Sequence, residues 1–403
     1  MIDRYPLRIV AGFWAAAAAV TAIAAWSITR FGEVRPLYKG PWRPMHLLLP
    51  WTRWDGGWYQ QIATDGYFYD PTRQSSVAFW PTYPLTLKPF VALGVNPYVA
   101  GFFVTVAATS AAIVAFAAWQ RDHRYADARL RPGRAAITLS IVAWLAYPYA
   151  YYLYGSLYSD ALFAAVALTA FWLLERDRPV LAGIVGIAAT AGRPFGSAVT
   201  VGLALRVAEH RWREANGREL TLPTLARHPV AVLRTMRRAD YGVALSGLGV
   251  LSYLGYLWIR FGSPWVFAAT EAHWGQGATP SVLLKRAFWP IVLHQWSPSP
   301  MAPLTLLAQA VIGVGVLTVG TLTVRRHHGL GPAGFVALTI MPPLVFSKDF
   351  QGIGRYTLAA FPVFAVLGFH LRPHLRLARV GLVASAACMV LLASLFARGF
   401  YLS

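Results

Sequence analysis

Long apolar runs separated by short basic segments most limit what this chain can fold into. The first run, residues 7–29, is about 23 residues long and would reach roughly 34 Å as a helix, enough to span a bilayer. Of 403 residues, 57% are hydrophobic and only 13% are charged, and a soluble globular domain is about a quarter charged. We therefore predict an all-α polytopic membrane protein.

About eleven transmembrane helices are expected, two of them short or broken. After residues 7–29 they are placed at 93–119, 135–153, 160–174, 180–205 (in two parts), 241–259, 303–324, 331–346, 356–371 and 380–396. The segment 180–205 is too short for two full spans, and Gly192-Arg193-Pro194 interrupts it. We interpret it as two short half-helices that meet at Arg193, either re-entrant or crossing a thin region, because broken helices at membrane depth line a cavity or pack in protein.

The distribution of charge predicts the orientation. The net charge is +20, and 22 of the 36 Lys and Arg residues fall in the segments that this topology places beside the N-terminus. The positive-inside rule then places the N-terminus and residues 206–240 in the cytoplasm, and residues 54–84 outside the plasma membrane. A charge spread in this way is typical of membrane orientation and does not indicate a nucleic-acid partner. The first run lacks a small-residue cleavage site, so we interpret it as an uncleaved helix, and the single cysteine, Cys388, excludes an intramolecular disulfide.

The first outer loop, residues 30–88, mixes carboxylates with aromatic rings. Asp55, Asp65 and Asp70 lie among Trp54, Trp58, Tyr59, Tyr67, Tyr69, Trp80 and Tyr83. Rings that pack on the C–H faces of a pyranose, and carboxylates that bind or deprotonate hydroxyls, suit sugar chemistry. The alternative is amphipathic helices lying at the membrane interface, where Trp and Tyr are common in any case.

The order of residues in this loop resembles the first luminal loop of the PIG-V family, which adds the second mannose in glycosylphosphatidylinositol synthesis. The loop has Trp-Asp, then Trp-Tyr, Ile-Ala, Gly-Tyr and Phe-Trp-Pro-Thr-Tyr-Pro (79–84). Four later segments resemble the family in the same order: YGSLYSDALF (154–163), AATAGRPFG (188–196), RFGSPWVFAATEAHWGQ (260–276) and GRYTLAAFPV (354–363). Asp160 stands where the family has Glu, Arg193 is displaced within its motif, and Glu271 or His273 falls where Gln is common.

The resemblance implies a single GT-C-like transmembrane domain over residues 1–403, with extracytoplasmic loops at 30–88 and 261–302 and interfacial helices in the first. It implies a glycosyltransferase, expected to be an inverting mannosyltransferase. The enzyme would move mannose from polyprenyl-phosphate mannose to a glycolipid, lipid-linked glycan or protein acceptor on the outer face. Arginines can replace a metal at a monophosphate leaving group, so no cofactor and no divalent metal are expected.

Asp55 is the predicted catalytic base. It follows the first span closely, Gly56-Gly57 leaves space beside it, and it matches the acid of the family's Trp-Asp motif. Arg355 and Lys348 are predicted to bind the donor phosphate, with Arg193 as a third cation, because the Arg fork binds phosphate bidentately. The predicted substrate-binding residues are Trp54, Trp58, Tyr59, Tyr67, Tyr83, Tyr158, Asp160, Glu271, His273, Trp274 and Tyr356.

Other interpretations of these residues stay open at this stage. Asp160 follows Ser159 at a helix start, where an acid is favoured electrostatically, and Arg193 and Arg355 could serve only in ion pairs or headgroup contacts. The same scaffold could transfer another polyprenyl-phosphate sugar. A non-catalytic lipid or glycolipid transporter is a third possibility, although a transporter should show related halves or paired interrupted helices.

Overall fold

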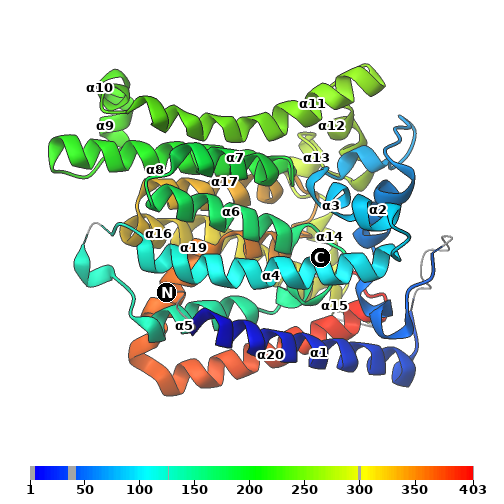
Figure 1. Cartoon of the computed structure of the whole chain (residues 1–403). Helices are drawn as coiled ribbons and strands as arrows, with labels where there is room; N and C mark the ends of the chain where they lie inside the picture. The colour runs from blue at the N-terminus through cyan, green and yellow to red at the C-terminus, as the bar shows by residue number, and fades with distance from the viewer. Residues whose placement is uncertain (1–4, 35–41, 126, 298–300, 403) are drawn as a thin grey trace.

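The computed structural model describes residues 5–34, 42–125, 127–297 and 301–402, and every regular element in these ranges is helical. The longer helices lie side by side in a bundle (Figure 1). They are α1 (Tyr5–Phe31), α4 (Pro97–Asp122), α5 (Arg134–Leu145), α6 (Asp160–Glu175), α7 (Pro179–Thr190), α8 (Ser197–Asn216), α11 (Leu248–Phe261), α15 (Met301–Gly315), α16 (Thr321–His328), α17 (Leu330–Phe346), α19 (Phe361–Leu371) and α20 (Leu375–Ala397). The predicted all-α fold class is confirmed.

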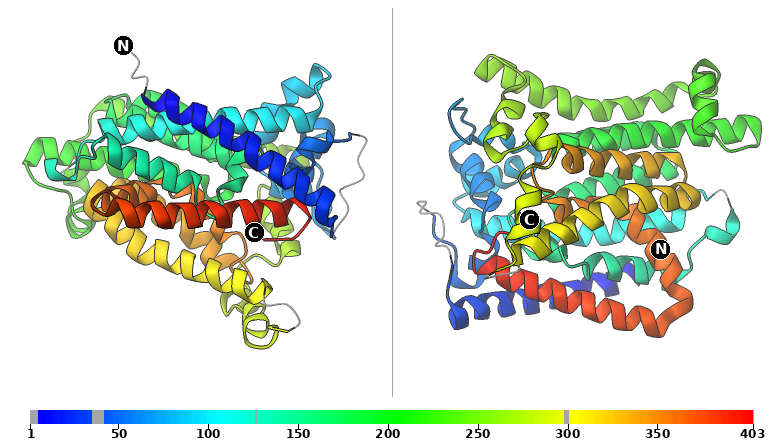
Figure 2. Two further views of the ribbon diagram at one scale, coloured as in Figure 1. Left: turned by 90° about the horizontal axis from the view of Figure 1, so that it is seen from below. Right: turned by 180° about the vertical axis from the view of Figure 1, so that it is seen from behind.

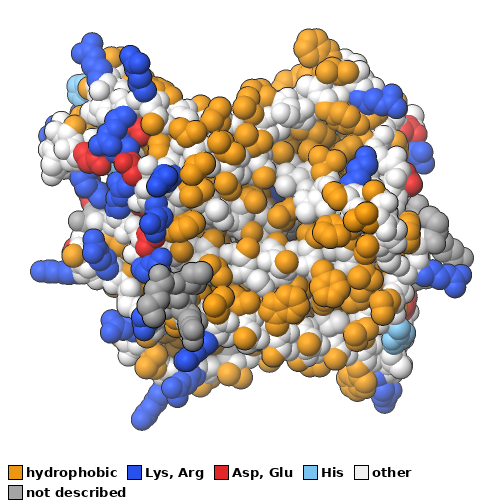
Figure 3. All heavy atoms as spheres, in the orientation of Figure 1, with side chains coloured by type: hydrophobic (Ala, Val, Ile, Leu, Met, Phe, Trp, Pro, Cys, Tyr) orange, Lys and Arg blue, Asp and Glu red, His pale blue; other side chains and the backbone are white. Residues whose placement is uncertain are grey.

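On the face shown in Figure 3, apolar side chains form a broad band across the middle of the bundle, and charged side chains gather at its two ends. Five helical stretches are long and apolar enough to cross a membrane: Tyr5–Phe31, Pro97–Asp122, Arg238–Phe261, Met301–His328 and Phe361–Ala397. Three shorter apolar helices accompany them, Arg134–Leu145, Pro179–Thr190 and Leu330–Phe346. Each segment predicted to cross contains a described helix, and the number of eleven spans stays a prediction.

The two ends of the bundle differ in character. At the end where α1 begins, which we call the basic end, lie α9 (Leu222–Arg227), α10 (Pro229–Arg234) and many Lys and Arg side chains (Figures 1 and 3). At the opposite end, the loop end, lie α2 (Asp55–Asp65), α3 (Thr82–Ala92) and α12 (Val266–Glu271) (Figure 1). The first outer loop and the polar segment 206–240 therefore lie on opposite sides of the apolar band, as the sequence predicts.

Aromatic packing joins the central helices. Phe171 of α6, Phe335 of α17 and Phe361 of α19 are fully buried, and each pair of these rings has centroids 5.2–5.8 Å apart. The first helix, α1, packs on both α4 and the last helix, α20, so helices from the two ends of the sequence lie side by side (Figure 2). Because these contacts join helices far apart in sequence, loops from distant parts of the chain meet at the loop end.

Four predicted helices differ from the structure. The segment 241–259 begins in a 3-10 helix (Arg238–Gly247) that precedes α11, and a 3-10 turn (Thr357–Ala359) divides the segment 356–371 before α19. The segment 135–153 was expected to be one helix, but α5 ends at Leu145 and a 3-10 turn (Ala150–Tyr154) follows. Pro148 explains this ending, because proline disfavours helical backbone in the residue before it. In the broken segment, α7 and α8 do meet at the turn that carries Arg193, yet α8 is longer than the predicted half-helix and continues to Asn216.

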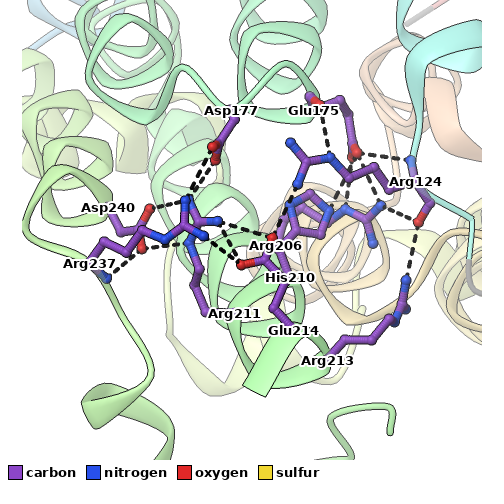
Figure 4. A network of polar contacts seen from close by, with 10 residues as sticks. All are labelled: Arg124, Glu175, Asp177, Arg206, His210, Arg211, Arg213, Glu214, Arg237 and Asp240. Carbon is purple, nitrogen blue, oxygen red and sulfur yellow. Dashed lines mark hydrogen bonds and ion pairs between the residues drawn. The ribbon is translucent and has the colours of Figure 1, made fainter. Parts of the chain in front are cut away.

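Charged side chains of α8 form a network of polar contacts with residues of neighbouring segments at the basic end (Figure 4). Arg206, 1% exposed, binds Glu175 of α6 at 2.8 Å, and Arg211 binds both oxygens of Asp240 at 2.8 Å. The backbone N–H of Arg124 also donates to Glu175, at 3.0 Å. These charge-assisted bonds satisfy groups that burial would otherwise penalise, so they hold the α6, α8 and 238–247 segments in a single arrangement.

Short helices fill the loop end. The first outer loop contains a 3-10 helix (His46–Trp51), α2, a 3-10 turn (Ser76–Ala78) and α3, and the second contains α12, a 3-10 turn (Ala272–Trp274), α13 (Pro280–Leu283) and α14 (Phe288–His294). Hydrogen bonds join the two loops: the Ser75 N–H donates to Thr270 Oγ1 at 3.1 Å, and Gln74 Nε2 donates to the His273 carbonyl at 3.3 Å. Tyr253 of α11 also donates to the Val77 carbonyl, at 2.7 Å. The helix α18 (Ile353–Tyr356) lies between α17 and α19.

Candidate active site

A cavity of about 590 Å³ opens at the loop end. Its walls come from five separate parts of the chain: residues 54–80, Ser159 at the start of α6, the turn at 192–195, the second outer loop at 271–276, and the segment 347–356. Tyr401, near the C-terminus, completes the lining. The size suits a small sugar-like ligand, since ligand pockets commonly measure about 300–1,000 Å³.

The central charged pair of the cavity is Asp55 with Arg355. Arg355 Nη1 donates to Asp55 Oδ2 at 2.6 Å, although the two residues are 300 positions apart in sequence. The Asp55 side chain is 22% exposed and that of Arg355 12%. The predicted base and the predicted phosphate ligand are therefore brought together, and both remain reachable from the cavity.

The backbone around Asp55 is strained and supported. Asp55 is the first residue of α2, and Trp54 before it has φ of 53°, a left-handed conformation that is uncommon for a bulky residue. The Asp55 N–H donates to Tyr158 Oη at 3.2 Å, and the Trp54 ring lies 4.8 Å from that of Tyr401. Such strain persists only where the surroundings hold it, and it is concentrated at functional sites.

A second Asp–Arg pair closes the inner wall. Arg193 Nη2 lies 2.6 Å from Asp160 Oδ1, with side chains only 5% and 1% exposed. Arg193 Nε donates to Ser159 Oγ at 3.1 Å, which in turn accepts a bond from Tyr59 Oη at 3.0 Å. Asp160 is the first residue of α6, and neither of its side-chain oxygens has a hydrogen-bond partner among the described residues. It therefore does not cap α6, and its contact is the ion pair that neutralises Arg193.

The Tyr356 ring lies between the two arginines. The guanidinium carbon of Arg355 lies 5.2 Å from the ring centroid, and that of Arg193 lies 5.7 Å from it. Two N–H-bearing atoms, Arg193 Nη1 and Arg355 Nε, are buried without a hydrogen-bond partner in the part of the chain that the structure describes. The cavity thus carries cationic groups with unused donors, an arrangement that suits an anionic ligand.

An aromatic wall faces these charges. The ring of Trp58 stacks on Phe79 at 5.5 Å, and Trp274 lies edge-on to both, at 5.8 and 5.9 Å. The His273 side chain belongs to the same wall. Its Nε2 lies 3.1 Å from the Pro71 carbonyl oxygen, and this contact joins the two outer loops. The wall therefore offers flat apolar faces next to polar groups, as sugar binding requires.

Glu271 lies at the end of α12 on the cavity lining. Burial, together with the negative charge of Asp55 and against the opposing charge of Arg355, raises the pKa of its carboxyl to about 8. Below pH 8 this side chain is therefore mostly a neutral acid that can donate a hydrogen bond. Burial also raises the pKa of Tyr59 to about 12, so its hydroxyl keeps the proton that it donates to Ser159.

Four predicted substrate-binding residues do not line the cavity. Tyr83 and Tyr158 are buried, at 0% and 1% exposure. Tyr67 donates to the Phe79 carbonyl at 2.8 Å and packs on Tyr253, and Asp160 lies behind Arg193. All four support residues that do face the cavity. The other predicted residues line it: Trp54, Asp55, Trp58, Tyr59, Arg193, Glu271, His273, Trp274, Lys348, Arg355 and Tyr356.

Sequence reasoning missed several lining residues. They include Gln74, Ser159, Phe195, Gln276, Asp349, Gln351 and Tyr401. Phe195, Ser159 and Gln351 are direct or near neighbours of residues that were singled out, so proximity in sequence could have found them. Tyr401 carries no such signal, because it reaches the cavity only through the packing of α20 against α1.

No family model matches this chain, and no curated protein matches it. Among solved structures, the chain is similar to the oligosaccharyltransferase of Archaeoglobus fulgidus in its apo form, with a TM-score of 0.47 and 11% identity. The match covers all of this chain and 57% of that one. The chain is also similar, over 95% of its length, to 55% of oligosaccharyltransferase AglB from that organism, solved in complex with an inhibitory peptide and a dolichol-phosphate, with a TM-score of 0.44 and 12% identity. The chain spans a little over half the length of these structures.

Proposed function

We propose that this protein is a GT-C-type, PIG-V-like glycosyltransferase of the plasma membrane that transfers mannose from polyprenyl-phosphate mannose, with inversion, to a glycolipid, lipid-linked glycan or protein acceptor. The loop end would face outward, since the basic end fits the cytoplasmic side by the positive-inside rule. No cofactor or divalent metal would take part.

One observation carries the proposal: a cavity beside the ends of spanning helices holds Asp55 against Arg355, 2.6 Å apart, next to an aromatic wall. A base, a phosphate-binding cation and a sugar-stacking surface are the three parts that transfer from a lipid phosphate sugar needs. Their place at the edge of the apolar band suits a donor whose lipid chain stays in the bilayer.

The proposed step is a single displacement. The Asp55 carboxylate takes the proton of an acceptor hydroxyl, whose oxygen bonds to the anomeric carbon as the bond from that carbon to the phosphate oxygen breaks. The polyprenyl phosphate leaves with the bonding electrons, and the glycosidic bond forms on the opposite face of the sugar. Positioned base catalysis of this kind contributes roughly 10²–10⁴-fold.

Cationic side chains would stabilise the leaving group. The donor is a phosphodiester with one negative charge, and the released monoester gains a second, so charge accumulates on the phosphate during the reaction. Arg355, Lys348 and Arg193 line the cavity, and fixed positive groups directed at developing charge are an effective form of catalysis. When the phosphate draws Arg355 away from Asp55, the carboxylate loses its counter-charge and becomes a stronger base.

The proposal is tested by incubating the purified protein with radiolabelled polyprenyl-phosphate mannose and a membrane lipid extract, then identifying the labelled product. Transfer of label by the wild type but not by Asp55→Asn supports it. Transfer only from another polyprenyl-phosphate sugar would replace the mannose assignment. Movement of unaltered labelled lipid across vesicles, without any product, would instead indicate a transporter.

A further inference from the structure

Lys285, in the second outer loop, is buried against the end of α17 and the residues that follow it. Its side chain is 8% exposed, and its Nζ donates to the Val345 carbonyl oxygen at 3.0 Å and to that of Ser347. The same ammonium lies 4.8 Å from the centroid of the Phe350 ring. Carbonyls at the end of a helix carry partial negative charge, so a lysine here satisfies groups that α17 leaves unpaired.

The backbone at this contact is strained on both sides. Lys285 has φ of 52° and Phe350 has φ of 67°, conformations that side chains with a Cβ rarely adopt. Backbone of this kind is unfavourable and is retained only where neighbouring contacts impose it. Phe288, at the start of α14, packs edge-on to Phe350 at 4.9 Å, so the loop holds this segment by a ring as well as by the ammonium.

The segment held by Lys285 carries part of the cavity lining. Lys348 and Asp349 lie within it, and Arg355 follows on α18. Two glycines of the second loop add to the contact: the Gly277 N–H donates to the Phe346 carbonyl at 2.9 Å, and Gly275 lies so close to Lys348 that an added Cβ would be 2.6 Å from its Cδ. The second outer loop therefore sets where the cationic side of the cavity stands.

Keeping a lysine in this place carries a cost. Burial lowers the pKa of Lys285 to about 8, against the opposing attraction of Asp349, the charged neighbour that acts on it. An apolar side chain would avoid that desolvation but would leave the Val345 and Ser347 carbonyls without this donor. The cost is consistent with a role in holding the segment.

We propose that Lys285 is a positioning residue, which holds the 345–350 segment so that Lys348 and Arg355 face the phosphate of the lipid-linked donor. The proposal rests on the proposed function for the identity of the ligand. The position of the segment, however, can be measured without any substrate. A loosened segment would present its cations less often, so the effect falls on donor binding more than on the chemical step.

The test compares Lys285→Met, which keeps the length of the side chain but removes its donors, with Lys285→Arg, which keeps the charge. Lys88→Met serves as the matched control, because Lys88 is an exposed lysine on α3. Hydrogen–deuterium exchange of residues 345–352 is measured on each purified full-length protein without ligand. Steady-state kinetics with polyprenyl-phosphate mannose then give kcat and the donor KM.

We expect Lys285→Met to lose exchange protection in 345–352 and to raise the donor KM at least ~10-fold, with kcat changed less than ~3-fold; Lys285→Arg should recover part of both. Gly275→Ala, which leaves the charge unaltered but displaces Lys348, should also raise the donor KM. Unchanged exchange and unchanged KM in a folded Lys285→Met protein would overturn the proposal. A wild type inactive with every polyprenyl-phosphate sugar would refute the proposed function instead, and the exchange data would still decide the role of Lys285.

Discussion

Replacing Asp55 by Asn tests the proposed chemistry most directly. Asparagine has the same shape and keeps an oxygen that can accept the hydrogen bond from Arg355, now 2.6 Å from the carboxylate. The amide cannot take the acceptor proton. The backbone contact of residue 55 with Tyr158 Oη, at 3.2 Å, does not depend on the side chain, so the fold around α2 should persist.

The expected loss in turnover is ~10²–10⁴-fold, or about 2.7–5.4 kcal/mol in the activation free energy. Stability should fall far less. The Asp55 and Arg355 side chains are 22% and 12% exposed, so the pair is neither fully exposed nor fully buried. Breaking an exposed ion pair costs about 0–1 kcal/mol of stability, and removing one partner of a buried pair costs about 3–5 kcal/mol. Because the amide keeps one hydrogen bond, we expect a loss of about 1–2 kcal/mol in the free energy of unfolding. Donor affinity should stay the same or increase, since Asp55 no longer competes with the phosphate for Arg355.

The assay measures kcat, donor affinity and thermal unfolding on the same purified preparations. Asp65→Asn is the matched control, because Asp65 ends the same helix, is exposed and does not line the cavity. Near-normal turnover by Asp55→Asn would reject the base assignment and direct attention to Glu271, another carboxyl that lines the cavity. Weaker donor binding in a folded variant would refute the competition between carboxylate and phosphate.

Three further predictions follow from the same geometry. Arg355→Lys should lose most activity and raise the donor KM although it keeps the charge, because the bidentate fork is lost; unchanged kinetics would contradict the phosphate assignment. The pKa of Glu271 is about 8 in the folded protein and 4.5 ordinarily. Between these two pH values the carboxyl ionises in the unfolded chain but stays protonated in the folded one, so the free energy of unfolding should fall as pH rises from about 4.5 to 8. Glu271→Gln should remove that dependence in pH-resolved unfolding, and a profile identical to the wild type would contradict it. In a Cys388→Ala background, Arg73→Cys should react with an impermeant thiol reagent on intact cells and Arg218→Cys should not; the reverse labelling would overturn the orientation.

Local patterns were enough to predict the helical class, the two outer loops and the basic end. Apolar length and the position of Lys and Arg act on each segment separately, so α1 could be recognised without knowing its neighbours. Pro148 is an instance where a local signal was present but overlooked. For the cavity, Asp55, Arg355 and the aromatic residues beside them were predicted because they stand in motifs that have a recognisable order.

Only the tertiary structure decided which of these side chains face one another. Tyr83 and Trp58 belong to the same aromatic loop, yet Tyr83 is buried against α4 and Trp58 lines the cavity. The Asp55–Arg355 pair joins residues 300 positions apart, and Lys285 reaches the Val345 carbonyl at the end of α17 across 60 positions. Such contacts depend on how the helices pack and on the path of each loop. Both result from many weak interactions between distant residues, so they leave no pattern at fixed spacing in the sequence.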